Sequence, residues 1–446
     1  MEKEIIFLPD WHSSANYLQE LKERIDCLQI LFRLGNNMEK SFNNLLTDFV
    51  FSENTNQSKT LVTETTINGY TIPTFINEYW TAKQRQAHSL HEVSYRACFK
   101  PQLPRFFIER LTKIGDVVYD PFSGRGTTII EAALLHRNII ANDINPLSKI
   151  FSLPRLNIPT IQEISDRLTS IPTMETILSD IDLSMFYHTG TLSEILSLSK
   201  YLSSRAKNGK EDFIDHWIRM VATNRLTGHS KGFFSVYTLP PNQAVSAASQ
   251  IKINRQRNQE PEYRNTRDIV LKKSRQLIKE INEEQKKALH LVANNAQFLT
   301  ADARSTTAIM DNSVTLTVTS PPFLDVVQYA NDNWLRCWFN GIDAENVSRN
   351  ITMSRTTADW CNVMGDVFKE LFRITKKNGW IAFEVGEVQN GKIKLEEFVI
   401  ELGLNAGFSC EAIMINQQLF TKTANIWGIA NNSKGTNSNR IVIFKK

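Results

Sequence analysis

The run VVYDPFSGRGTT at residues 117–128 decides the fold class of this chain. Its first residues are β-branched and aromatic, which favours a buried strand, and Asp120 stands where that strand ends. Gly124 and Gly126 then allow a tight turn, and the apolar residues from Ile129 onward begin a helix. The order of strand, acid, glycine turn and helix predicts an α/β protein. A Gly-x-Gly pair alone is weaker, because it is found in the strand-to-helix turns of many α/β proteins.

A second informative run is TSPPF at residues 319–323, directly after the strand-like stretch 313–318. Pro321 and Pro322 fix the backbone of a turn and remove two N–H donors. The Ser320 hydroxyl and the Pro321 carbonyl can then accept hydrogen bonds from an aromatic amino group, and the Phe323 ring can stack on a base. An ordinary surface turn is the alternative. The position after a strand favours a ligand site, since open α/β sheets bind ligands at the carboxyl ends of their strands.

Together these runs resemble the amino-type DNA methyltransferases of type II restriction-modification systems, over about residues 71–154 and 296–446. The resemblance implies an α/β fold with a Rossmann-like, S-adenosyl-L-methionine-dependent methyltransferase sheet of seven mostly parallel strands. It implies S-adenosyl-L-methionine as the cofactor and a catalytic turn made of Ser320, Pro321, Pro322 and Phe323. The methyl group would be transferred by direct displacement, without a covalent enzyme intermediate.

The resemblance also assigns cofactor-binding residues. Asp120 is expected to bind the methionine ammonium and Phe122 to pack near the cofactor, while Gly124 and Gly126 let the backbone approach it. Asp143 follows the next strand about 20 residues further on, a spacing at which doubly wound folds place a carboxylate on the ribose hydroxyls. The remaining predicted cofactor-binding residues are Pro121, Thr127, Asp302, Phe99 and Pro101.

Two of these assignments have a structural alternative of similar weight. Asp302 resembles the acid that contacts the adenine amino group, but an exposed Asp ahead of a helix is also a common N-cap. Phe99 and Pro101 belong to a segment, residues 94–108, that resembles the one packing over the methionine end in this family. The helix predicted in that segment has apolar residues at helical spacing and could simply be core.

The carboxyl-terminal third predicts the end of the sheet. Residues 325–339 resemble the family helix that follows the catalytic turn, with Tyr329 and Asn333 one turn apart, either aimed at the target pocket or packed in the core. Strand-like stretches follow at 379–386, 410–415 and 439–444, with a helix predicted over 394–404. The last two strands are expected to form an antiparallel hairpin.

Residues 156–292 depart from the compact family order and predict a helical insertion, a candidate DNA target-recognition region, between two parts of the catalytic domain at 61–155 and 293–446. The insertion carries a basic run in which Arg255, Arg257, Arg264 and Arg267 are predicted to bind DNA phosphates, with Asn, Gln and Arg side chains able to read bases. A solvated amphipathic helix is the alternative.

Residues 1–60 predict a separate helical arm, because leucines and isoleucines recur at helical spacing between residues 18 and 31. Residues 52–68 are rich in Ser, Thr and Asn and have the composition of a linker. Dimer contact, DNA contact and extension of the core all fit the arm.

Composition agrees with a globular DNA-modifying enzyme. With 41% hydrophobic and 22% charged residues and no apolar run of spanning length, we expect a cytoplasmic protein without a membrane segment. The five cysteines are scattered without paired spacing, so neither a metal site nor a disulfide framework is predicted. The net charge of +4 is small, and the local basic run matters more for binding double-stranded DNA.

Ser320 bears on which atom is methylated. Family members that modify the cytosine amino group usually carry Ser before Pro-Pro, whereas those that modify adenine usually carry Asp or Asn, so we expect N4 of a flipped cytosine, with N6 of adenine as the alternative. An RNA amino-methyltransferase is a weaker alternative. A cytosine-carbon methyltransferase is excluded, because it needs a Pro-Cys pair and the chain has none. The resemblance implies that methylation protects DNA from a cognate restriction endonuclease.

Overall fold

The computed structural model describes residues 41–50, 59–80, 87–95, 98–174, 178–239, 244–322, 329–351, 356–385, 387–388, 393–417 and 438–446. The chain divides into two compact units, residues 1–62 and residues 63–446. In the first unit, a short helix, α2 (Phe42–Thr47), is capped by the Ser41 hydroxyl. Most of the predicted helical arm lies outside the described residues. The second unit contains all of the sheet except the first two residues of β1, together with the turn at Ser320 and the predicted insertion.

The described residues form a nine-stranded sheet in the order β1-β2-β10-β11-β7-β6-β3-β4-β5. β11 is antiparallel to both of its neighbours, and the pairs from β7 to β5 are parallel. A separate two-stranded sheet joins β8 and β9. The strands are β1 (Leu61–Ile67), β2 (Tyr70–Asn77), β3 (Val117–Asp120), β4 (Asn138–Asn142), β5 (Gln297–Leu299), β6 (Val314–Thr319), β7 (Thr375–Val385), β8 (Glu387–Val388), β9 (Ile393–Lys394), β10 (Ser409–Gln417) and β11 (Ser438–Lys445).

The predicted α/β fold is confirmed, with its carboxyl-terminal hairpin. β10 and β11 pair antiparallel, from Ser409 opposite Lys445 to Gln417 opposite Ser438. The prediction of seven strands was wrong, because β1 and β2 extend the sheet beyond β10. The interpretation of residues 52–68 as a linker was also wrong where it overlaps β1. Asn68 and Gly69 both have positive φ, 49° and 83°, as the turn of a tight β-hairpin requires, and this Asn-Gly signal in the sequence was missed.

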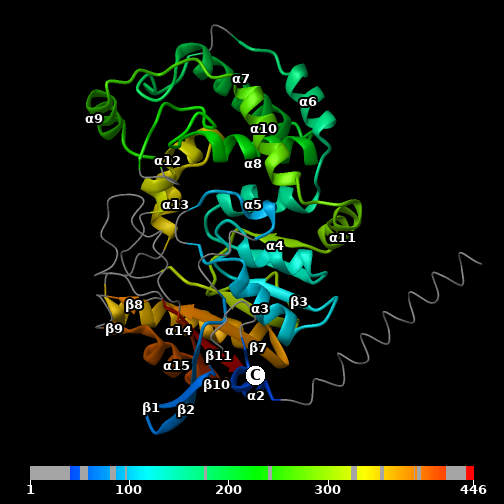
Figure 1. The fold of residues 1–446 in the computed structure, drawn as a ribbon, viewed down its shortest axis with the longest axis vertical. Helices are drawn as coiled ribbons and strands as arrows, with labels where there is room; N and C mark the ends of the chain where they lie inside the picture. Colours follow the sequence, from blue (N-terminus) through cyan, green and yellow to red (C-terminus); the bar gives the residue numbers. More distant parts are fainter. Residues whose placement is uncertain are drawn as a thin grey trace, which may run out of the picture. The chain divides into compact units, whose positions relative to one another are not determined.

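Helices cover both faces of the sheet (Figure 1). α3 and α4 pack against each other and against strands β3, β4 and β6, and α15 packs on α14, β10 and β11. The core beneath α14 and α15 is rich in phenylalanine, with the Phe368 ring centroid 4.9 Å from Phe383 and 5.4 Å from Phe444. The elements of this part are η3 (Ser89–His91), α3 (Gln102–Leu111), α4 (Thr127–Leu134), α5 (Leu147–Ser152), η4 (Leu153–Leu156), α12 (Tyr329–Asn340), α13 (Ala344–Asn350), α14 (Thr357–Ile374) and α15 (Leu395–Ala406).

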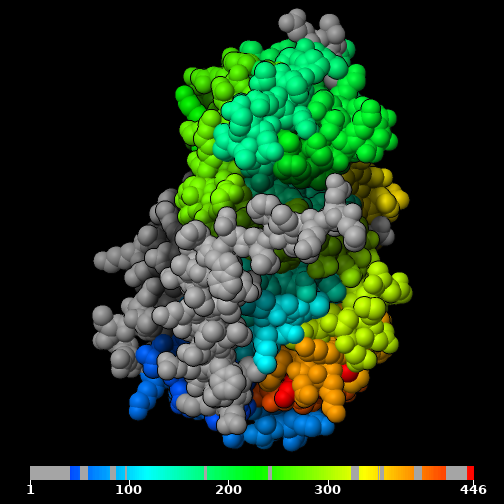
Figure 2. Space-filling view, turned by 90° about the vertical axis from the view of Figure 1, so that its right-hand side faces the viewer, coloured from blue at the N-terminus to red at the C-terminus, as the bar shows by residue number. Residues whose placement is uncertain are grey.

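Residues 156–292, predicted as an insertion, lie between β4 and β5 and contain helices α6 to α11. Figure 2 shows the green residues of this segment at one end of the second unit and the cyan and orange residues of the sheet domain at the other. Its most buried helix, α8, contacts α6 and α10 within the insertion and α5, η4 and α12 outside it. The helices are α6 (Ile161–Ser170), α7 (Thr189–Lys207), α8 (Phe213–Arg225), α9 (Ala247–Arg257), α10 (Thr266–Ile278) and α11 (Glu283–Ala293). None of the helices in the described part of the chain is long and apolar enough to cross a membrane.

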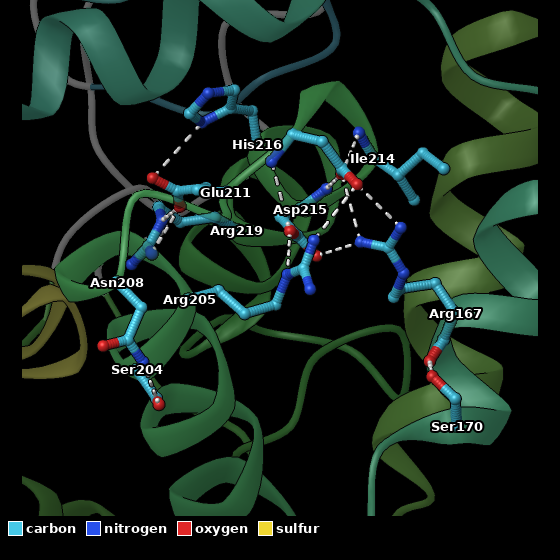
Figure 3. A network of polar contacts seen from close by, with 11 residues as sticks. Arg167, Ser170, Ser204, Arg205, Asn208, Glu211, Ile214, Asp215, His216 and Arg219 are labelled. Atoms are coloured by element: carbon cyan, nitrogen blue, oxygen red, sulfur yellow. Dashed lines mark hydrogen bonds and ion pairs between the residues drawn. The ribbon is translucent and has the colours of Figure 1, made fainter.

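A network of charged groups joins three of these helices (Figure 3). Arg167 of α6 bonds both Asp215 and Asp212, the latter at 2.8 Å, and Arg205 of α7 bonds the same two carboxylates at 2.5 and 3.2 Å. Asp212 is the N-cap of α8, and Asp215 closes the capping box. Asp215 is fully buried. A carboxylate buried there requires its two cations, so the pairs fix how α6, α7 and α8 pack.

We therefore expect Asp215→Asn to lower the free energy of unfolding by roughly 3 kcal/mol, the lower end of the range for breaking a buried ion pair. Both arginines stay partly exposed, which limits the loss. Urea unfolding followed by circular dichroism measures it. Asp166→Asn, an exposed acid on α6, is the matched control and should change stability by no more than about 0.5 kcal/mol. Equal stability of the two variants would contradict the role assigned to Asp215.

Candidate functional site

A cavity lies at the carboxyl ends of β3, β4 and β6, where parallel sheets place ligands. The structure brings together at its wall ten of the fourteen residues that the sequence assigned to the cofactor site and the catalytic turn. These ten are Phe99, Asp120, Pro121, Phe122, Gly124, Thr127, Asp143, Asp302, Ser320 and Pro322. Of the other four, Pro101, Gly126 and Pro321 do not line it, and Phe323 lies outside the described residues.

Asp120 is 1% exposed at the end of β3. Its Oδ1 accepts hydrogen bonds from the Thr319 hydroxyl at 2.7 Å and from the Phe122 N–H at 3.1 Å. Burial raises the pKa of Asp120 to about 7, against the lowering effect of these donors. A cationic ligand in the cavity would offset the cost of keeping this carboxylate ionised.

Asp143 follows β4 and also faces the cavity. It accepts from the Gly124 N–H at 2.8 Å and from the Asn145 N–H at 2.9 Å, so it holds the glycine turn in place. Burial raises the pKa of Asp143 to about 6. Beside it, the buried Asn145 side-chain nitrogen lines the cavity and has no hydrogen-bond partner among the described residues. An unpaired buried donor next to a carboxylate suits a ligand hydroxyl, which can both donate and accept.

Asp302 is engaged by its own neighbour. Arg304 bonds both carboxylate oxygens, at 3.0 and 2.6 Å, and this pairing lowers the pKa of Asp302. The alternative of a helix N-cap is wrong, because residues 302–305 form a turn rather than the start of a helix. Asp302 still lines the cavity, with a carboxylate already neutralised by Arg304.

The two glycines of the turn differ in what surrounds them. Gly124 lines the cavity with φ of 51°, and a Cβ there would make only ordinary contact with the Tyr95 ring. A Cβ on Gly126, where φ is 77°, would stand 2.3 Å from the Ser152 Oγ and 3.3 Å from the Arg155 Nη2. Gly126 therefore allows the turn to pack closely on α5 and η4.

Arg155 lies behind the glycine turn and forms hydrogen bonds to it and to two neighbouring segments. It is fully buried and donates to the carbonyls of Phe151 at 2.9 Å, Leu90 at 3.0 Å and Arg125. Burial lowers the pKa of Arg155 to about 9. Because these acceptors belong to three separate segments, Arg155 ties them together behind the glycine turn. Nothing in the sequence around Arg155 distinguished it from a surface arginine.

The segment over the cavity contributes Phe99, as predicted, and also Tyr95 and Cys98. Pro101 is buried at the N-cap of α3 and not at the cavity wall. Asn333 of α12 is 3% exposed and accepts from Arg336 at 2.8 Å, and it does not line the cavity. Its predicted role toward a target base is therefore not supported by its position. The Tyr329 side chain lies outside the described side chains.

Ser320 follows the last residue of β6 and lies beside Glu384 of β7, since Thr319 pairs with Phe383 in the parallel register. The Ser320 hydroxyl lies near the Glu384 carboxylate and opposes the rise in its pKa, and Asn439 donates a hydrogen bond to the same carboxylate at 2.8 Å. Glu384 is 8% exposed, and burial raises its pKa above the ordinary value.

The Trp360 indole donates to the Pro322 carbonyl at 3.0 Å and holds the turn. Glu384 and Trp360 were not identified from the sequence, because only strand pairing and helix packing bring them to Ser320.

The four arginines predicted to bind DNA divide into two pairs. Arg264 donates to the carbonyls of Ser230, Phe233 and Ser235, and Arg267 donates to the Ile171 carbonyl at 2.6 Å. Both therefore hold the insertion together. Arg255 and Arg257 are exposed on α9, where Arg257 stacks on the Tyr237 ring at 3.8 Å.

Comparison with known proteins finds a family match over part of the chain. Residues 35–149 match the N6/N4 methyltransferase family model, described as DNA methylase. The type II methyltransferase M.MjaII of Methanocaldococcus jannaschii is 32% identical over 82 residues, 18% of this chain. The aligned part spans 15% of that relative's length.

Solved structures were also found, with lower similarity. A methyltransferase from Methanosarcina mazei is 10% identical with a TM-score of 0.29, and the match covers 76% of this chain and 96% of that one. A protein from Thermus thermophilus, described as a putative DNA modification methylase complexed with S-adenosyl-L-methionine, is 20% identical with a TM-score of 0.20, over 33% of this chain and 53% of that one. The family match and the motifs within it support the amino-methyltransferase family of DNA methylases for residues 35–149, and they support S-adenosyl-L-methionine as the cofactor.

Proposed function

We propose that this protein methylates the N4 amino group of a cytosine that is flipped out of double-stranded DNA, at a specific sequence. The observation that carries the proposal is the position of Ser320, which lies at the wall of the same cavity as Asp120 and follows the β6 residue that pairs with Phe383, next to Glu384. The proposal includes protection of the host DNA from a cognate restriction endonuclease, which would place the enzyme in the cytoplasm with that DNA.

The neighbouring Glu384 carboxylate would orient the Ser320 hydroxyl. A hydroxyl carries one donor and two acceptor lone pairs, whereas an ionised carboxylate only accepts. A Ser320 hydroxyl that donates to Glu384 would keep its lone pairs for the hydrogens of an amino group. An aromatic amino nitrogen is a poor nucleophile while its lone pair is delocalised into the ring. Acceptors on its hydrogens, Ser320 Oγ and the Pro321 carbonyl, would favour the tetrahedral geometry that attack requires.

Other side chains of the cavity would hold the cofactor. Asp120 would bind the methionine ammonium, and Asp143 with the unpaired Asn145 amide would bind the ribose hydroxyls. Bound S-adenosyl-L-methionine supplies a methyl group on a sulfonium sulfur. These residues fit it, since the cavity presents a buried carboxylate for a cation, polar groups for hydroxyls and the apolar walls of Phe99, Phe122 and Met364.

The reaction leaves one proton to remove, because N4 gains a methyl group and must lose a hydrogen. We assign this proton to Ser320 Oγ, while the proton of Ser320 passes to Glu384. Positioning of the base contributes as well, because the reacting atoms need to be held in line. Unstacking the base costs a few kcal/mol, which contacts inside the pocket would offset.

Cytosine is favoured over adenine by the residue at position 320. A serine arm is shorter than the Asp or Asn that adenine-modifying members usually carry, and its acceptor is a hydroxyl oriented by Glu384. N6 of adenine is the second candidate, since a small shift of the turn would accommodate the larger ring.

Nucleoside analysis tests the product. We expect the purified protein, incubated with genomic DNA and labelled S-adenosyl-L-methionine, to yield labelled N4-methylcytosine on digestion and mass spectrometry. N6-methyladenine alone would reject the cytosine assignment, and label found only in transfer RNA would reject DNA as the substrate.

Cofactor affinity should depend on pH through Asp120. Burial raises the pKa of Asp120 to about 7 in the free protein, and a bound ammonium would lower it again. Binding at pH 6 therefore releases a proton, and affinity should increase about tenfold for each unit by which the pH rises toward 7, and then level off. Calorimetry in two buffers of different ionisation enthalpy measures both effects.

Asp120→Asn should weaken binding more than tenfold, or about 1.4 kcal/mol, and should abolish most of this pH dependence. Asp116→Asn, on the same chain segment but paired with Lys376 at the opposite end of β3, is the control and should leave affinity unchanged. If folded Asp120→Asn bound the cofactor with unchanged affinity, the assignment of Asp120 to the cofactor site would be wrong.

Turnover should depend on Ser320 and Glu384 together. Ser320→Ala is expected to lower kcat about 100-fold or more with little change in cofactor affinity, because the hydroxyl acts on the amino group in the transition state. Wild-type kcat should fall with decreasing pH as Glu384 is protonated, at a higher pH than an exposed glutamate would give, since burial raises its pKa. Glu384→Gln should lower kcat and abolish this fall of kcat at low pH. Ser313→Ala, just before the same strand, is the matched control, and an equal loss in it would refute the assignment.

A further inference from the structure

Helix α9 is attached to the insertion by amide side chains on one face. Gln250 donates to the Tyr237 carbonyl at 3.0 Å, and Asn254, one turn later, donates to the Met185 carbonyl at 2.8 Å. Gln259, beyond the helix, donates to the Tyr237 carbonyl at 2.9 Å. Gln250 is the one buried residue among the eleven of the helix. α9 is therefore held in a fixed rotation by polar contacts, with little burial of apolar surface.

The opposite face of α9 is exposed. At 100° per residue, Ala248, Lys252, Arg255 and Gln256 lie on the side of the helix away from Gln250 and Asn254. All four are exposed. The helix contains three basic residues and no acid, and the nearest acids in sequence, Glu260 and Glu262, lie beyond its end.

α9 is also coupled to the helix that follows the catalytic turn. Just before α9, the Ala244 N–H donates to the Asp332 carbonyl at 3.0 Å, and the Trp334 indole donates to the Val245 carbonyl at 3.2 Å. Figure 1 shows α12 between α9 and the sheet. Arg336 of α12 donates in turn to the Ser94 carbonyl, next to the Tyr95 that lines the cavity.

We propose that α9 enters the major groove of the DNA duplex beside the target cytosine and reads base edges with Arg255 and Gln256. This inference rests on the proposed function. A helix of eleven residues is about 16 Å long at ~1.5 Å per residue, and a groove about 12 Å wide admits it. No other class of partner suits the face as well, since a positive, polar face with little apolar surface fits a polyanion.

Each residue of the face suits a particular contact. Arg255 can bond both acceptors of a guanine edge, and Gln256 can bond the donor and acceptor of an adenine edge. Ala248 is small enough to approach a thymine methyl group, and Lys252 would neutralise a phosphate. Arg257, stacked on Tyr237, lies on the anchored side of the helix and would not read bases.

The test uses the full chain, expressed in a bacterial host that lacks DNA methylation, with the recognition motif read by modification-sensitive sequencing of the host genome. Arg255→Ala and Gln256→Ala should each relax one position of the motif, by roughly 5- to 150-fold in preference. Lys252→Ala should leave the motif unchanged and reduce the slope of log affinity against log salt by about 1. Cofactor binding by calorimetry should match wild type in all three, which shows that each variant is folded.

Arg275→Ala is the matched control, because Arg275 is an exposed arginine in the last turn of α10, in the same insertion. It should keep both the motif and the salt slope. An unchanged motif in both folded variants, Arg255→Ala and Gln256→Ala, would overturn the role of α9 while leaving the methyltransferase proposal in place. A wild-type protein that methylates no base of the genome would instead overturn the proposed function, and the inference with it.

Discussion

The hydrogen bond from the Thr319 hydroxyl to the Asp120 carboxylate links the two halves of the site. The residues are 199 positions apart in sequence, and the bond is 2.7 Å long. Asp120 ends the strand of the cofactor side, and Thr319 ends the strand from which Ser320 continues. Because β3 and β6 are parallel neighbours in the middle of the sheet, their ends cannot shift independently. The spacing between Asp120, the proposed ammonium ligand, and Ser320, the proposed catalytic residue, is thus fixed by strand pairing, which is more rigid than loop geometry.

Two charged side chains, Glu384 and Arg155, are buried behind the cavity. Glu384, beside Ser320, accepts from Asn439, and Arg155 donates to three backbone carbonyls. Such burial is costly, and these hydrogen bonds offset part of the cost. Gly126 makes the second of these arrangements possible, since any side chain there would collide with Ser152. A glycine that resembles a cofactor-contact position also serves the packing of a buried arginine.

The sequence predicted those parts of the site that are local in the chain. Asp120, Gly124 and Asp143 follow strands within short motifs, and Ser320 lies in a rigid Pro-Pro turn, so these motifs and the family that they resemble indicated that they converge. Glu384 could not be predicted, because its role depends on a strand register between β6 and β7. The basic run in the insertion could be recognised from the sequence, but its exposed arginines could not be separated from those that hold the fold together. Whether an arginine faces solvent, like Arg255, or three carbonyls, like Arg264, depends on the tertiary fold.

The position of the insertion explains how a chain can acquire it without disturbing the catalytic sheet. It connects β4 to β5, the edge strand, and a parallel pair needs a crossover connection there in any case. The entropic cost of lengthening such a connection grows only slowly with its length. The side chain of Asn142, at the end of β4, still bonds the Ala301 backbone beyond β5 at 3.0 and 3.1 Å, so the cavity wall is closed across the insertion. Since α8 packs on both α5 and α12, the insertion rests on the sheet domain at the side of the catalytic turn. α9 is carried on that support, so the proposed reading of DNA by this helix would take place in a fixed relation to Ser320.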